Sequence, residues 1–168
     1  QQERGRRAGT ENVPGIVGLA AAAKRAFRIM EEKTAKEIEL RDYFISRIEK
    51  EIPYSKLNGH RTKRLPNNIH VGFEFIEGES MLIMLDMKGI CGSSGSACTS
   101  GSLDPSHVLL AIGLPHEKAH GSLRLTLSEE NTKEEMDIVA DELVKIVERL
   151  RSMSPLWEDF VKKQKNNG

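Results

Sequence analysis

The feature that most constrains this chain is a run of small residues with one thiol in its middle, residues 93–101. Every residue there is glycine, alanine, serine, threonine or cysteine, so the run cannot build a packed core and is expected to be a loop. Small neighbours and a flexible backbone make Cys98 accessible, as a sulfur nucleophile needs to be. The alternative is a Gly/Ser linker that happens to contain a cysteine. Its position between an apolar run and the helix start at Pro105 argues against a linker.

The bulk composition excludes several classes of partner and location. The 168 residues suffice for one domain with a core, and 25 basic and 25 acidic side chains leave no net charge. Nucleic acid is therefore not an expected partner. No apolar run approaches the ~20 residues that cross a bilayer, and the polar start shows no secretory signal. Two cysteines, Cys91 and Cys98, make no disulfide framework, which favours the cytoplasm.

Periodicity and turn signals predict an α+β domain with a small, mainly antiparallel sheet. Asn12 and Pro14 suit the start of a long helix, and Thr132 with Glu135 suits a capping box. The expected helices span residues 14–52, 77–87, 105–112 and 132–153, and the expected strands span 69–75, 89–92 and 122–127.

Four segments resemble one enzyme family. Residues 93–109, SSGSACTSGSLDPSHVL, resemble the active-site cysteine loop of NifS/IscS-like cysteine desulfurases. These are fold-type I pyridoxal-phosphate (PLP) enzymes of the class V aminotransferase superfamily. Residues 3–12 are similar to the family segment after the cofactor lysine, and residues 121–128 resemble the strand with the substrate-carboxylate arginine. Residues 154–157 resemble the family's C-terminal end, so the resemblance runs along the whole chain in order.

The resemblance implies a domain organisation. Residues 1–14 would be the end of a PLP-binding large domain, 15–52 the long linking helix, and 53–168 the small C-terminal domain with the cysteine loop. The chain has no initial Met and no lysine in a motif matching the family's Schiff-base lysine. We therefore expect the C-terminal part of a longer enzyme, inactive alone, with the PLP domain supplied in cis or in trans.

The resemblance also implies three site residues. Cys98 would attack the sulfur of L-cysteine, leaving L-alanine and a persulfide on Cys98, and could be a transient ligand of an iron–sulfur cluster. Arg124 would clamp the substrate carboxylate; a surface arginine paired with a carboxylate is the alternative. Thr10, otherwise a turn or cap residue, would reach the PLP phosphate across a dimer interface.

The expected partners follow from the same family: L-cysteine, PLP, an iron–sulfur scaffold or other sulfur acceptor protein, and a second copy in a homodimer. No resident metal site is expected. Cys91 follows the apolar Ile90 and is expected to be a buried structural thiol. The five histidines show no shared helical spacing that would make a metal site.

Two other functions remain open. One is a selenocysteine lyase or another class V PLP enzyme, although an aminotransferase needs no thiol such as Cys98. The other is a non-catalytic module that carries a persulfide or binds a scaffold. Such a module needs no arginine at Arg124, which makes it the weaker alternative. A phosphate-binding glycine loop is excluded, because residues 89–101 contain no Gly-Lys-Ser/Thr ending.

Overall fold

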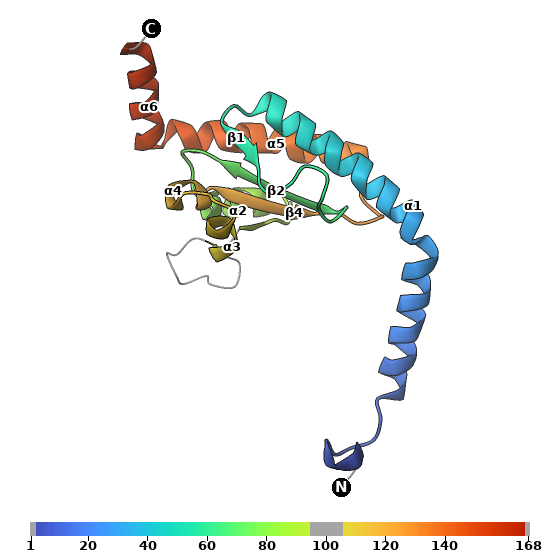
Figure 1. Cartoon of the computed structure of the whole chain (residues 1–168). Helices are drawn as coiled ribbons and strands as arrows, with labels where there is room; N and C mark the ends of the chain where they lie inside the picture. Colours follow the sequence, from blue (N-terminus) through green and yellow to red (C-terminus); the bar gives the residue numbers. More distant parts are fainter. Residues whose placement is uncertain (1–2, 95–105, 167–168) are drawn as a thin grey trace. The chain divides into compact units, whose positions relative to one another are not determined.

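The structure is a computed structural model that describes residues 3–94 and 106–166. The chain divides into two compact units, Gln1–Thr34 and Ala35–Gly168, and helix α1, Val13–Glu51, belongs to both (Figure 1). Within the described residues, no helix is both long and apolar enough to cross a bilayer.

Unit 1 contains the 3₁₀ turn η1, Glu3–Gly5, and the first turns of α1. Asn12 caps the helix as predicted, since its Oδ1 accepts the backbone N–H of Gly15 at 3.1 Å. Pro14 occupies the first turn, where its missing N–H costs nothing. The predicted start of the long helix is thus confirmed.

Unit 2 is built around a four-stranded antiparallel sheet in the order β1-β2-β4-β3. The strands are β1 Ser55–Leu57, β2 Asn68–Phe73, β3 Ser93–Ser94 and β4 Ser122–Thr126. The helices after α1 are α2 Gly78–Asp86, α3 His107–Ala111, α4 His116–Ala119, α5 Lys133–Ser152 and α6 Pro155–Asn166. The expected α+β class is confirmed.

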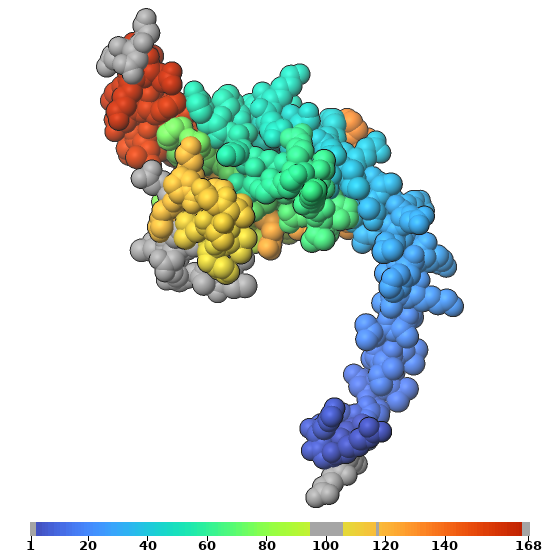
Figure 2. Space-filling model, in the orientation of Figure 1, coloured from blue at the N-terminus to red at the C-terminus, as the bar shows by residue number. Residues whose placement is uncertain are grey.

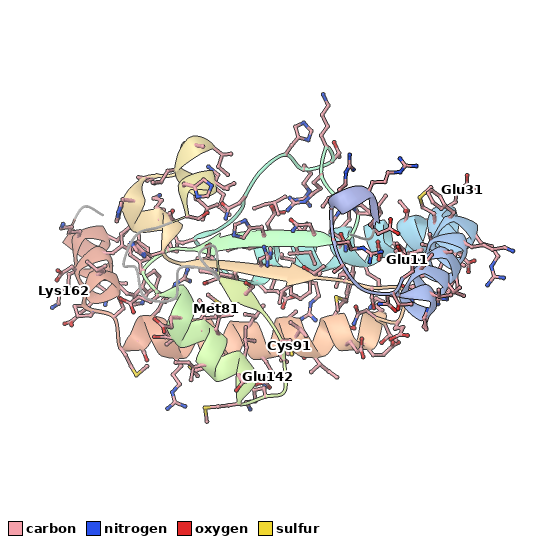
Figure 3. The ribbon with its side chains drawn as sticks, turned by 90° about the horizontal axis from the view of Figure 1, so that it is seen from below. Glu11, Glu31, Met81, Cys91, Glu142 and Lys162 are labelled. Atoms are coloured by element: carbon pink, nitrogen blue, oxygen red, sulfur yellow. The ribbon has the colours of Figure 1, made fainter. Side chains whose placement is uncertain are left out.

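One face of the sheet forms the core. Apolar residues alternate along β2 and β4, so that they share one face and pack against α2, α5 and the later turns of α1. Figure 3 shows α5 on this side of the sheet and α3 and α4 on the other, and Figure 2 shows α3 and α4, in yellow, at the surface. The buried members are Ile69, Val71, Phe73, Leu123, Leu125, Met81, Leu85, Phe44, Ile45, Ile48, Leu143, Ile146 and Val147.

The sequence prediction was wrong about the sheet's edges. Residues 89–92 form no strand; the edge strand is β3, Ser93–Ser94, inside the run expected to be a loop. Strand β1 and helices α4 and α6 were not expected. Elements of two to five residues are too short to carry a periodic pattern, and their backbone is held by partners distant in sequence.

Candidate active site

Arg124 is the one predicted site residue that the structure places on the sheet. It lies in β4 between Leu123 and Leu125, which are only 2% and 9% exposed, while Arg124 itself is exposed. The alternation therefore turns the guanidinium away from the core, as predicted. Among the residues that the structure describes, no carboxylate forms an ion pair with it.

Strand β3 brings the start of the cysteine segment next to this arginine. Ser93 is the register partner of Arg124, and Ser94 that of Leu123. The chain enters residues 95–105 directly after this pair. Cys98 itself lies outside the described residues. The segment that contains Cys98 therefore begins at β3, the strand beside Arg124.

On its other side Arg124 pairs with His70 of β2. Burial lowers the pKa of His70 to about 4, with further lowering by the charges of Arg124 and Arg64. The Arg64 side chain donates to the backbone oxygens of Asn68 at 3.0 Å and Asn58 at 3.3 Å. Two guanidinium groups therefore raise the potential around His70, and an anion such as a carboxylate would be attracted to this face of the sheet.

Thr10 lies in unit 1, after a left-handed Gly9 with φ 97°. Its side chain is exposed. Arg7 donates to the Gly9 oxygen at 3.0 Å, and Arg4, Arg6 and Arg7 line an open hollow of about 440 Å³ with Glu3. A hydroxyl and several guanidinium groups are donors that suit a phosphate. In the structure Arg7 is also paired with Glu11, and Thr10 does not line the hollow.

Cys91 is a correction to the sequence prediction. Its thiol is free and exposed rather than buried, and it lies in no strand (Figure 3). The chain leaves α2 through a left-handed Gly89 with φ 72° and runs at the surface. Ile90 packs against the core, but that contact does not extend to the next residue.

Two of the histidines lie close together, although they make no metal site by themselves. His116 and His120 are four residues apart at α4, and their ring centroids lie 5.1 Å from each other. Both are exposed, and no group of three or more metal-ligating side chains occurs in the described ranges. No sequence signal predicts His70 beside Arg124, because that place depends on pairing between strands far apart in sequence.

The family model of the class-V aminotransferases matches residues 1–139 of this chain. Among curated relatives, the chain is 57% identical over 163 residues to "Cysteine desulfurase IscS" of Clostridium botulinum, covering 96% of this chain and 41% of that protein. It is also 57% identical over 155 residues to "Cysteine desulfurase IscS" of Methanosarcina thermophila, covering 92% and 38%. The chain thus spans about two fifths of the length of these relatives.

Solved structures show the same likeness. A "NIFS-LIKE PROTEIN" superposes with a TM-score of 0.75 at 32% identity, covering 89% of this chain and 37% of that one. A NifS-like protein from Rickettsia africae gives a TM-score of 0.75 at 28% identity, covering 88% and 38%. The helix order and antiparallel sheet of this chain therefore correspond to one part of a larger fold.

Proposed function

This chain belongs to the aminotransferase class-V family, and we propose that it is the C-terminal part of a cysteine desulfurase. In this proposal it removes sulfur from L-cysteine, gives L-alanine, and holds the sulfur as a persulfide on Cys98. The observation that carries the proposal is Arg124, an exposed arginine without a described carboxylate partner, placed in register beside the strand that leads into the cysteine segment.

The roles of the chain's own residues follow from their chemistry. Arg124 binds the substrate carboxylate through two parallel N–H donors, and so fixes the amino acid in one orientation. The Cys98 thiolate forms an S–S bond to the substrate sulfur as the substrate carbon–sulfur bond breaks, and the carbon fragment is protonated to alanine. The Thr10 hydroxyl would donate a hydrogen bond to the phosphate of PLP. When bound, PLP supplies the electron sink that receives the electron pair of the breaking bond.

The proposal includes the partners that this chemistry requires. A PLP-binding domain, in cis or in trans, supplies the cofactor lysine. The end of that large domain is residues 1–14, the linking helix is residues 15–52, and the small C-terminal domain is residues 53–168. A second copy of the enzyme supplies the dimer interface at Thr10. A scaffold for iron–sulfur assembly, or another acceptor protein, takes the persulfide in the cytoplasm.

Two substitutions in the complete enzyme, in which this chain is joined to a PLP-binding domain, test these roles. Cys98→Ser keeps the shape of the side chain and removes the sulfur, so L-cysteine still binds but no protein persulfide forms. Arg124→Lys keeps the charge and loses one of two carboxylate contacts, which raises KM roughly ten- to a hundredfold. Persulfide still forms at saturating L-cysteine. Mass spectrometry of the intact protein and steady-state kinetics measure both effects.

The outcomes separate the proposal from its alternatives. If a persulfide still forms on the Cys98→Ser protein, Cys98 is not the sulfur acceptor. If the KM of the Arg124→Lys enzyme is unchanged, Arg124 does not bind the substrate and is a surface arginine. Faster release of selenium from selenocysteine, with negligible turnover of L-cysteine, would favour a selenocysteine lyase. Transfer of a preformed persulfide without any turnover would favour the carrier module.

A further inference from the structure

The residue opposite Arg124 on β2 is His70, and the reaction proposed above gives it no part. The two are register partners in an antiparallel pair. Side chains that stand directly opposite on such strands share a face of the sheet, with Cβ atoms about 4.5–5.5 Å apart. The imidazole therefore lies next to the stem of the arginine that is proposed to bind the substrate.

The imidazole is neutral and one of its nitrogens has no described partner. Burial, followed by the charges of Arg124 and Arg64, holds the pKa of His70 at about 4, so the ring carries one N–H and one lone pair at neutral pH. Its Nε2 is buried, and within the described ranges it has no hydrogen-bond partner. A buried polar nitrogen without a partner is unfavourable, so a nearby N–H donor gains by bonding to it.

Arg124 is the donor that the strand register places opposite His70, and its charge acts on the ring. It is exposed, and among the described residues no carboxylate holds it in place. A long side chain of this kind loses rotamer entropy when it binds a ligand, and a neighbour that orients it beforehand reduces that loss. Ser93, the partner on the other side, is too short to orient a guanidinium, so of the two strand partners His70 is the one that suits that role.

We propose that His70 is a positioning residue: the lone pair of its Nε2 accepts an N–H of Arg124 and holds the guanidinium ready for the substrate carboxylate. This inference rests on the proposed function of Arg124. A neutral ring suits the role, because a protonated imidazole would repel the guanidinium and offer no lone pair.

Three variants of the complete enzyme test this role. His70→Leu removes the acceptor, and His70→Asn carries an amide too short to reach the position of Nε2. His70→Gln places an amide oxygen close to that position. Leu and Asn should raise the KM for L-cysteine roughly tenfold with kcat within about twofold, and Gln should restore the KM to within about threefold. The dissociation constant of L-alanine, measured by calorimetry, should change in parallel with the KM.

A matched control lies on the same face of β4. Thr126 is the partner of Asn68, two pairs along the strands from Arg124, and Thr126→Val should leave the KM unchanged. If His70→Leu fails to fold, the comparison of Asn with Gln carries the test, since both keep a polar side chain. An unchanged KM for both Leu and Asn would overturn the inference.

A double-mutant cycle separates positioning from other roles. If His70 acts through Arg124, His70→Leu has no further effect on the L-alanine dissociation constant in the Arg124→Ala background. An equal effect in both backgrounds would overturn the inference and show that His70 acts independently. If Arg124→Ala alone leaves binding unchanged, the proposed function of Arg124 fails first, and the role of His70 falls with it.

Discussion

At the scale of single residues, one half-buried histidine, His70, makes the stability of the fold depend on pH. Burial and the charges of two arginines, Arg124 and Arg64, hold the pKa of His70 at about 4, below the ordinary value of 6.5. The unfolded chain therefore takes up a proton near pH 6.5 that the folded chain refuses until about pH 4. This difference links the stability of the fold to pH.

We predict a loss of stability as the pH falls from 6.5 towards 4. Above pH 6.5 His70 is neutral in both the folded and the unfolded chain, so its contribution to the free energy of unfolding is fully present. Between pH 6.5 and pH 4 that free energy decreases by about 1.4 kcal/mol for each pH unit. Most carboxylates titrate below pH 5, so urea unfolding between pH 5 and 6.5 separates the five histidines from the carboxylates, and a His70 variant identifies the share of His70. His70→Gln should remove the slope in that window. A slope that persists in the variant would assign the effect to other groups.

At the scale of elements, two close contacts hold the parts of unit 2 together. The first joins β2 to the turn before β4, where the N–H of Phe73 donates to the Gly121 oxygen at 2.7 Å. A Cβ at Gly121 would lie 2.1 Å from the Phe73 oxygen and 2.8 Å from the Ile76 oxygen. Only a residue without a side chain allows this approach.

We therefore expect Gly121→Ala to destabilise the fold by at least about 3 kcal/mol, because backbone atoms of β2 must move. Gly72→Ala is the matched control, since a Cβ there meets its nearest atoms at an ordinary 3.7 Å. Its effect should stay within about 1 kcal/mol. Urea unfolding measures both, and equal effects would show that the turn shifts easily.

The second contact attaches α6. Arg151, in the last turn of α5, is only 5% exposed and donates to the backbone oxygens of Glu74 at 3.2 Å and Tyr54 at 3.4 Å. Its guanidinium carbon lies 5.0 Å from the Trp157 ring centroid. Phe160 of α6 extends this cluster to Tyr54, with ring centroids 5.1 Å apart. Burial lowers the pKa of Arg151, but an arginine stays charged, so its partners must compensate that charge.

Arg151→Met should weaken the attachment of α6. Methionine keeps an apolar stem but loses two charge-assisted hydrogen bonds and the cation–π contact, a loss of about 2–4 kcal/mol. Trp157 is the single tryptophan of the chain, so its emission reports on α6 and should shift to longer wavelength. Arg149→Met, an exposed arginine of the same helix end, should leave the emission unchanged. An unshifted Arg151→Met spectrum would mean that the aromatic rings alone hold α6.

At the scale of the whole molecule, the proposed chemistry is divided between this chain and a PLP-binding domain. Cys98 and Arg124 are here, while no lysine of this chain lies in a motif that matches the family's cofactor lysine. The chain alone, mixed with PLP and dialysed, should show no bound-cofactor absorbance and release no sulfide from L-cysteine. Adding the PLP-binding domain of a relative should restore both. Sulfide release by the chain alone, with free PLP excluded, would contradict this division.

Local sequence determined the long elements and the orientation of Arg124. The caps at Asn12 and Thr132, together with the period of the helices, predict α1 and α5 to within one or two residues. The alternation of 122–127 places Arg124 on the face opposite the core. These signals act between residues within about four positions of each other, so they can be read without knowing the fold.

Only the tertiary structure decided what stands beside Arg124. Register pairing places His70 on one side and Ser93 on the other. The same pairing makes a strand of Ser93 and Ser94, whose sequence predicts a loop. It also leaves Cys91 exposed and closes a cluster of aromatic rings around Arg151. Each of these depends on backbone hydrogen bonds or packing between segments far apart in sequence, and such partners leave no periodic trace in either segment.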